Sequence, residues 1–138
     1  MHRLVYYSAN RILGSIEELT AQVEQILATS RRNNEKVGVT GALMFSEGFF
    51  GQVLEGPQAA VEATFERIQR DARHSDVSLL QFEQIEKQQF ENWSMACVGQ
   101  TALIDFEGIG LSSGFDPAKL KGEKLLNRLV ELVIGELV

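Results

Sequence analysis

Apolar positions along the first hundred residues follow two different periods, and the alternation of these periods predicts strands and helices. Residues 3–8 form an apolar-rich run that is typical of a strand. Ser15 and Glu18 form a capping box, which predicts that a helix begins at Ser15. We expect this helix to fray near residues 31–34, because asparagines favour a terminus. Its apolar face recurs at helical spacing, at Ile16, Leu19, Val23, Ile26 and Leu27.

The following segment predicts a hairpin and a second helix. Strands are expected at 37–45 and 49–54, joined by a turn at 46–48. Pro57 suits the first turn of a helix. The buried stripe of that helix is expected to comprise Val61, Phe65, Ile68 and Ala72.

Two more strands, at 77–85 and within 90–98, complete the order β-α-β-β-α-β-β. This order predicts an α+β, ferredoxin-like sheet with one added strand and with both helices on one face. The groove between the helices is a natural place for a flat ligand. We therefore interpret residues 1–98 as one domain.

Residues 99–138 have a different pattern, which predicts a C-terminal linker and helical extension. Glycines within 99–114 indicate the linker, and Asp116-Pro117 suits a helix start. The extension can pack on the open face of the sheet or contact a partner or a second copy, and the sequence leaves both open. Its apolar stripe is Leu126, Leu129, Val130, Val133 and Leu137.

Composition narrows the classes of function. Hydrophobic residues make up 44% and charged residues 23%, which is ordinary for a globular domain. The net charge of -6 disfavours general binding of nucleic-acid phosphates. The single cysteine, Cys97, excludes an internal disulfide and a cysteine-based zinc cluster, and the presence of only two histidines disfavours a histidine-rich metal site.

Targeting and membrane signals are not found in the sequence. No apolar run approaches the ~20 residues that a membrane helix needs. Arg3 interrupts the N-terminal apolar stretch, which therefore does not read as a signal peptide. We expect a soluble protein located in the cytoplasm.

Adjacent amide side chains form the first candidate site. Asn33 and Asn34, after Arg32, can donate and accept several hydrogen bonds, which suits the edge of a heterocycle. A helix C-cap is the plainer explanation. Strand alternation places Gln52 on the face of Phe50 and Leu54, where its amide needs partners. Backbone groups can satisfy that amide as well as a ligand can.

Tyr6 is a further candidate, because a tyrosine beside a ligand can donate a hydrogen bond or an electron. On the first strand it shares a face with Leu4 and Ser8, and core packing explains it equally well. Trp93 and Met95 point the same way on the last predicted strand, where packing again accounts for both.

Charged residues of the second predicted helix form the last candidate group. Arg67 and Asp71 are four apart and His74 follows three later, so we expect them to share one helical face. With Arg70 and Arg73 nearby, this face can meet a phosphate or a sugar chain. A solvated helix face with one weak ion pair is the alternative.

Together and in this order, these residues resemble the BLUF family, which are flavin-based sensors of blue light. The resemblance covers about residues 2–98. It rests on Arg-Leu-Val-Tyr-Tyr-Ser at 3–8, Arg-Asn-Asn at 32–34, Gly-Val-Thr-Gly at 38–41, Gln-Val-Leu-Glu-Gly at 52–56, Asp71 with Arg73-His74, and Phe-Glu-Asn-Trp-Ser-Met at 90–95.

The resemblance implies a light-driven role for Tyr6 and Gln52. Tyr6 is the expected electron donor to the excited flavin, preferred over Tyr7 by its spacing to Ser8. Gln52 is expected to bridge Tyr6 and the flavin, and to rearrange its hydrogen bonds after an electron and a proton have moved. Asn33 is expected, together with its neighbour Asn34, to hold the isoalloxazine edge.

The resemblance also implies a cofactor tail and an output. Arg67, Asp71 and His74 are expected along the ribityl-phosphate side of the flavin, which is FAD or FMN. Trp93 and Met95 are expected to exchange position or hydrogen bonds during signalling. No catalytic domain follows residue 98, so we expect a non-enzymatic receptor that contacts a signalling protein and self-associates into a dimer or a larger ring.

Two other functions compete with this interpretation. Some ferredoxin-like domains are acylphosphatases, which use an arginine and an asparagine, but here no glycine-rich phosphate loop surrounds a candidate arginine. The other alternative is a regulatory module that binds a colourless metabolite. An absorption spectrum separates both from a flavin-based receptor.

Overall fold

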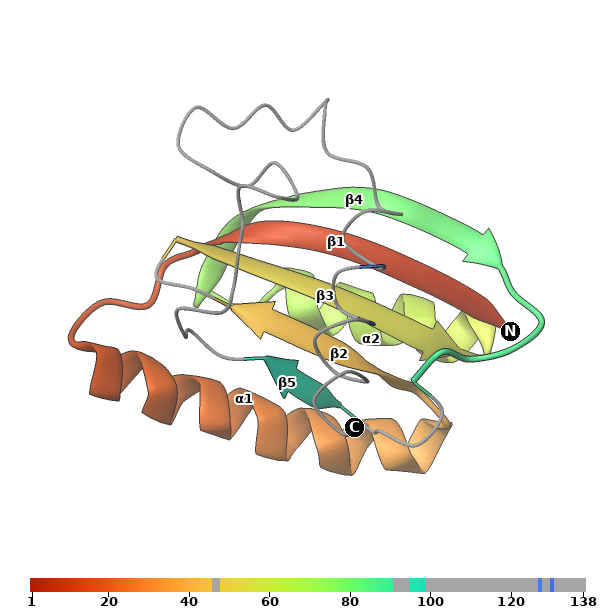
Figure 1. Cartoon of the computed structure of the whole chain (residues 1–138), viewed down its shortest axis with the longest axis horizontal. Coiled ribbons are helices and arrows are strands. Elements are labelled where there is room, and N and C mark those ends of the chain that lie inside the picture. The colour runs from red at the N-terminus through yellow and green to blue at the C-terminus, as the bar shows by residue number, and fades with distance from the viewer. Residues whose placement is uncertain (46–47, 91–94, 99–126, 128–129, 131–138) are drawn as a thin grey trace.

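The computed structural model describes residues 1–45, 48–90, 95–98, 127 and 130, and within them it contains a five-stranded sheet and two helices (Figure 1). In chain order the elements are β1 (His2–Asn10), α1 (Ile16–Val37), β2 (Thr40–Phe45), β3 (Phe49–Gly56), α2 (Gln58–Gln69), β4 (His74–Gln84) and β5 (Ala96–Val98).

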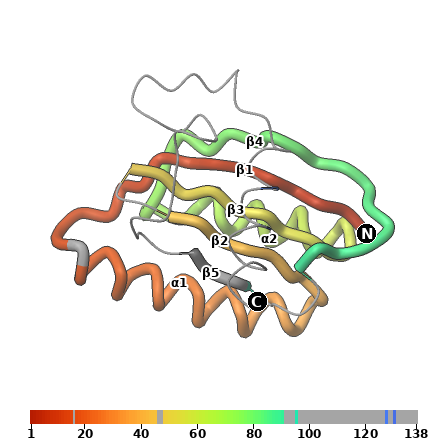
Figure 2. Tube along the Cα trace, in the orientation of Figure 1, coloured from red at the N-terminus to blue at the C-terminus, as the bar shows by residue number. Residues whose placement is uncertain are grey.

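The strands follow the order β4-β1-β3-β2-β5 across the sheet, and β1 lies between β3 and β4 in the Cα trace (Figure 2). β1 pairs antiparallel with β3 and with β4, and β2 pairs antiparallel with β3. β5 is added at the edge, parallel to β2. This topology confirms the predicted ferredoxin-like arrangement with one added strand.

Both helices pack on one face of the sheet, as predicted. α1 contributes Leu19, Val23 and Leu27 and α2 contributes Val61 to a single buried cluster. α2 lies behind the sheet in Figure 1. Burial of this apolar surface is the main stabilising contribution to the fold. The sheet residues that the helices cover include Leu4, Tyr6, Leu43, Phe50 and Leu54.

The start of α1 is as predicted, but its end is not. The hydroxyl of Ser15 accepts a hydrogen bond from the Glu18 backbone N–H at 3.2 Å. The helix continues beyond residues 31–34 to Val37, so the prediction of fraying there was wrong. Gly38 ends the helix because it adopts the left-handed conformation (φ 75°) and its N–H bonds the carbonyl of Asn34. As a result β2 begins at Thr40, later than the predicted residue 37.

α2 ends earlier than predicted, which corrects the expected charged face. The helix stops at Gln69 with Arg70 as its C-cap, so Ala72 is not part of its stripe. The Asp71 carboxylate accepts the Arg73 backbone N–H at 2.9 Å, a local turn that competes with helical bonding. His74 therefore begins β4, and Arg67, Asp71 and His74 do not share a helical face.

The β2–β3 hairpin depends on one close approach. A Cβ added at Gly41 would lie 1.9 Å from the carbonyl oxygen of Val53, so a side chain there would force the strands apart. β3 runs two residues further than the predicted 49–54. Of the last predicted strand, the structure describes β5 at Ala96–Val98. Trp93 and the predicted C-terminal linker and helix lie outside the described residues, apart from positions 127 and 130.

Candidate functional site

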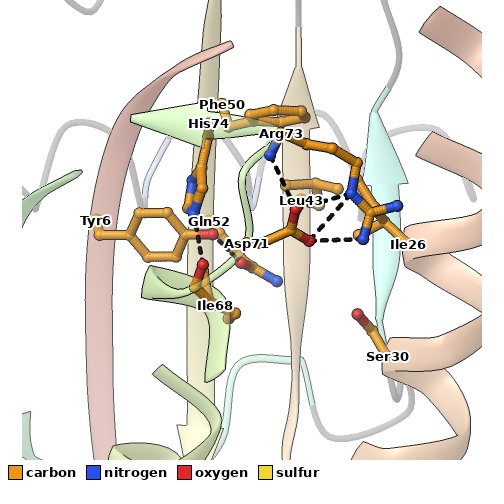
Figure 3. A pocket seen from close by; sticks show the side chains of 10 residues that line it. All are labelled: Tyr6, Ile26, Ser30, Leu43, Phe50, Gln52, Ile68, Asp71, Arg73 and His74. Carbon is orange, nitrogen blue, oxygen red and sulfur yellow. Dashed lines mark hydrogen bonds and ion pairs between the residues drawn. The ribbon is translucent and has the colours of Figure 1, made fainter. Parts of the chain in front are cut away.

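Tyr6 and Gln52 are direct partners in the β1–β3 register, so their side chains project side by side from the helix-covered face. The Tyr6 hydroxyl donates a hydrogen bond to Gln52 Oε1 (Figure 3). Gln52 Nε2 donates to Met95 Sδ at 3.3 Å. All three side chains are buried. The two ends of the glutamine amide therefore face different partners, a phenol and a thioether.

Tyr6 is held in its neutral form. Burial, and secondarily the negative charge of Asp71, raise the pKa of the Tyr6 phenol well above its ordinary value. The hydroxyl consequently keeps its proton and remains a hydrogen-bond donor to Gln52. A buried phenol can release an electron most readily when its proton has an acceptor at hand, and Gln52 Oε1 is such an acceptor.

His74 contacts Tyr6 and is fixed by hydrogen bonds on both ring nitrogens. Nε2 lies 2.5 Å from the carbonyl oxygen of Ile68, which can only accept, so Nε2 carries the proton. Nδ1 lies 2.7 Å from the hydroxyl of Ser8 and accepts from it. The imidazole stands edge-on to Tyr6, with ring centroids 6.3 Å apart, and to Phe50, 6.2 Å apart.

A cavity opens between the two helices, with the sheet as its floor. Its inner part brings Tyr6 and Gln52 opposite Ile26 and Ser30 of α1, with Ile68 of α2 beside them (Figure 3). An adjoining part, lined by some of the same side chains, extends along the helices. We call the two parts together the interhelical cavity. The predicted site residues that line one part or the other are Tyr6, Asn33, Asn34, Gln52, Arg67, Asp71 and His74.

Asp71 and Arg73 form the ion pair of the interhelical cavity. Arg73 Nη2 lies 2.5 Å from Asp71 Oδ2, and Arg73 Nε lies 2.9 Å from Asp71 Oδ1. Hydrogen bonds from Arg73 lower the pKa of the Asp71 carboxyl despite its partial burial. Asp71 is thus an ionised carboxylate paired with Arg73, and Arg67 instead donates to the Thr64 hydroxyl at 3.4 Å.

Several cavity residues were missed at the sequence level. Ser30 follows Ile26 by four residues and precedes Asn34 by four, so helical spacing alone places all three on one side of α1. That signal could have found Ser30. The role of Ser8 as the partner of His74 had no such signal, because the two residues are 66 positions apart.

The donor set of the interhelical cavity fits a flat heterocycle with a polar tail. Ile26, Leu43, Phe50 and Ile68 supply apolar surface for an aromatic ring system. The amides of Asn33 and Gln52 can bond its polar edge. Arginine side chains line the adjoining part, where a phosphate would be favoured. These features match the isoalloxazine and ribityl phosphate of a flavin.

Two kinds of feature are absent from the part of the chain that the structure describes. No group of three or more His, Cys, Asp and Glu side chains that could hold a metal ion occurs there. No helix in that part of the chain is long and apolar enough to cross a membrane.

Comparison with known proteins identifies the family. The profile of the BLUF family, described as sensors of blue light using FAD, matches residues 1–96. The photoactivated adenylate cyclase subunit beta of Euglena gracilis is 32% identical over 82 residues, which are 59% of this chain and 10% of that protein. The chain thus spans about a tenth of the length of that relative.

Solved structures agree with the family match. The ground state of BlsA superposes with a TM-score of 0.77 and 34% identity, covering 96% of this chain and 87% of that one. The dark-state structure of the BLUF protein BlrB gives a TM-score of 0.75 at 27% identity, covering 98% and 96% of the two chains. By fold, site and sequence, this chain belongs to the BLUF family of flavin-based sensors of blue light.

Proposed function

We propose that the domain formed by residues 1–98 is a blue-light receptor in which Tyr6 and Gln52 convert the excitation of a bound flavin into a change of hydrogen bonds. The observation that carries this proposal is the buried series from the Tyr6 hydroxyl through the Gln52 amide to Met95 Sδ, at the wall of the interhelical cavity. The Gln52 amide presents its acceptor end to Tyr6 and its donor end to Met95, so reversing the amide would change both hydrogen bonds at once.

The side chains around the cavity suit a non-covalent flavin, FAD or FMN. Asn33 and Asn34 bind the polar edge of the isoalloxazine, next to Gln52. Arg67 and Asp71 follow along the ribityl-phosphate side. His74, expected on that side from the resemblance, lines the inner part of the cavity and packs against Tyr6. No covalent attachment is needed, because apolar burial of a ring system with a few directed hydrogen bonds gives stable binding.

The flavin supplies the absorption of blue light and an electron-accepting excited state. Tyr6 gives up an electron, and its proton passes to Gln52 Oε1, to which it is already bonded. When the electron returns, Tyr6 regains a proton and no covalent bond has formed. Gln52 is left with its amide rotated or tautomerised. A change of one or two hydrogen bonds is worth about 1–3 kcal/mol, enough to bias a two-state element roughly ten- to a hundredfold.

An absorption spectrum before and after blue light tests the proposal. The purified protein should be yellow, shift modestly to the red when illuminated, and revert in darkness. Gln52→Leu should keep the colour and lose the shift, and a normal shift in this variant would refute the role of Gln52. A colourless protein from which no flavin can be extracted would favour the acylphosphatase-like or the metabolite-binding alternative.

Tyrosine substitutions test the electron donor with a matched control. Tyr6→Phe should suppress the photocycle, because the hydroxyl and its transferable proton are gone. Tyr7→Phe is the control: Tyr7 is equally buried, but it is the next residue on the strand and projects from the opposite face. An unchanged photocycle in Tyr6→Phe would move the donor to Tyr7 or Trp93.

The output of the receptor is a protein contact rather than a reaction at residues 1–98. We expect a downstream signalling protein to bind at the last strand or at the helix that the sequence predicts within residues 99–138. We also expect the receptor to self-associate into a dimer or a larger ring and to be located in the cytoplasm. Light scattering coupled to size-exclusion chromatography, in darkness and in blue light, measures the assembly.

A further inference from the structure

Met95 is held at two points by different elements. Its sulfur accepts a hydrogen bond from Gln52 Nε2 of β3 at 3.3 Å. Its backbone carbonyl accepts a second hydrogen bond from Arg31 Nε of α1 at 3.0 Å. The ladder between β5 and β2 begins one residue later, with Ala96 opposite Ala42. Within the part of the chain that the structure describes, the Met95 carbonyl is therefore bonded by the helix and lies outside the ladder with β2.

The two bonds differ in strength and in freedom. A thioether is a weak acceptor at the end of a side chain with three rotatable bonds, so the bond from Gln52 alone does not fix Met95. A guanidinium–carbonyl bond is charge-assisted and directional. Arg31 lies between Ser30 and Asn33 in the sequence, and Ser30 and Asn33 both line the interhelical cavity. One turn of α1 thus forms the cavity wall and also holds Met95.

We propose that Arg31 is a positioning residue that holds the Met95 backbone and so keeps the Met95 sulfur within reach of Gln52 Nε2 in darkness. The inference rests on the proposed function. Reversal of the Gln52 amide removes the donor from Met95, and the bond from Arg31 then opposes the departure of Met95. Arg31 consequently stabilises the dark arrangement relative to the illuminated one and speeds the return to it.

The rate of dark recovery tests the effect on the photocycle. Arg31→Ala should slow recovery about three- to tenfold, the range for losing one hydrogen bond that forms on the way back. Arg31→Lys should recover at an intermediate rate, because lysine retains a charged donor. The size of the red shift should not change, since Tyr6 and Gln52 are intact. Lys36→Ala is the matched control: Lys36 is also an exposed cation of α1.

Equal recovery rates for Arg31→Ala and Lys36→Ala would overturn the proposal. A merely structural role for Arg31 would lower the stability of the protein without changing the recovery rate. Folding is not expected to fail in any of these variants, because Arg31 is exposed to solvent.

Methionine-methyl NMR in darkness tests the same contact without photochemistry. The chain has three methionines, and Met44 is a buried internal control on β2. The methionine methyl groups are labelled with ¹³C, and the Met95 resonance is assigned with Met95→Leu. The Arg31→Ala substitution should shift or broaden the Met95 resonance and leave the Met44 resonance in place. An unchanged Met95 resonance would overturn the inference even in a photoactive protein. A perturbed Met95 in a protein that shows no photocycle would reject the receptor function and keep the contact.

Discussion

The two faces of the central sheet each bury one polar pair that joins β1 to β3. On the cavity face the pair is Tyr6 and Gln52, and on the other face it is Arg3 and Glu55. Arg3 Nε donates to Glu55 Oε2 at 2.8 Å, and both side chains are buried. The pairs lie on the same two strands and both are direct register partners, yet their surroundings differ.

On the face that carries Arg3 and Glu55, here called the far face, the polar groups around this pair bond one another and the backbone. Glu55 Oε1 accepts the backbone N–H of Phe90 at 2.8 Å. Gln88 Nε2 bonds the Glu55 carbonyl at 3.2 Å and the Thr40 hydroxyl at 2.8 Å. Arg3 has a second, longer contact of 3.5 Å to Glu83. This network holds the segment after β4 against three strands. Any rearrangement would leave a buried charge without its partner.

The cavity face uses weak partners for its central amide. Gln52 bonds a phenol and a thioether, and it lines both parts of the interhelical cavity. An amide can reverse its donor and acceptor ends at the cost of one or two neutral hydrogen bonds. Burial of a polar group therefore does not by itself indicate whether the group has a structural role or acts as a switch. The strength of its partners and its access to a cavity decide between them.

The largest expected effect is a loss of stability when the Arg3–Glu55 pair of the far face is broken. Glu55→Ala removes the counter-charge of a buried guanidinium, and we expect a loss of about 3 kcal/mol in the free energy of unfolding, measured with urea. Glu55→Gln should cost less, because it keeps an acceptor for the Phe90 N–H. The folded fraction of both variants should retain a normal red shift. A loss of the shift would mean that the far face takes part in the photocycle.

The matching substitution on the cavity face should have the opposite pattern, with a large effect on the red shift and a smaller effect on stability. Gln52→Leu should abolish the red shift while lowering the free energy of unfolding by about 1–2 kcal/mol, less than Glu55→Ala, because only neutral bonds are lost although the Tyr6 hydroxyl loses its acceptor. Urea unfolding and difference spectroscopy on the same sample measure both quantities. A destabilisation as large as that of Glu55→Ala would remove the distinction between the two faces.

A smaller effect is expected at the partner of His74. Ser8→Ala removes a buried donor to His74 Nδ1 and should cost about 1 kcal/mol in urea unfolding. Ser75→Ala is the matched control, since its hydroxyl bonds the exposed Arg11 and its loss should change stability by less than about 0.5 kcal/mol. Equal costs for the two serines would argue that the His74 contact is as weak as a surface bond.

The smallest effect concerns the ion pair of the interhelical cavity. The pKa of Asp71 is lower in the folded protein than in the unfolded chain because Arg73 bonds its carboxylate. The pair therefore contributes stability above about pH 4, and this contribution is lost as the pH falls through the folded-state pKa. Arg73→Ala should raise the pKa of Asp71, followed by NMR titration of its carboxyl carbon. No rise would show that Arg73 does not hold this carboxylate in solution.

Local patterns in the sequence determined much of the fold. Alternation on the strands placed Tyr6 and Gln52 each on a definite face, and the Ser15 capping box located the start of α1. The order of elements implied the ferredoxin-like sheet. These predictions were correct because a strand or a helix imposes its period on residues only two to four positions apart.

The ends of the two helices differ from the predicted ends, although the signals that set them are local. The asparagines at the end of α1 suggested a terminus, but Gly38 ends the helix one turn later. Asp71 pairs with Arg73 in a turn, not with Arg67 on a helix. At each place two local preferences competed, and the left-handed glycine and the turn at Asp71 prevailed over the asparagines and over helical spacing.

The site itself joins residues that no local period connects. Tyr6 bonds Gln52 across 46 positions of the chain, and Arg31 bonds Met95 across 64. Each residue type was visible in the sequence, but its partner depended on strand register and on the packing of α1 beside β5. Register is set by burial of one entire sheet face, so a property of the whole core determined which side chains meet at the site.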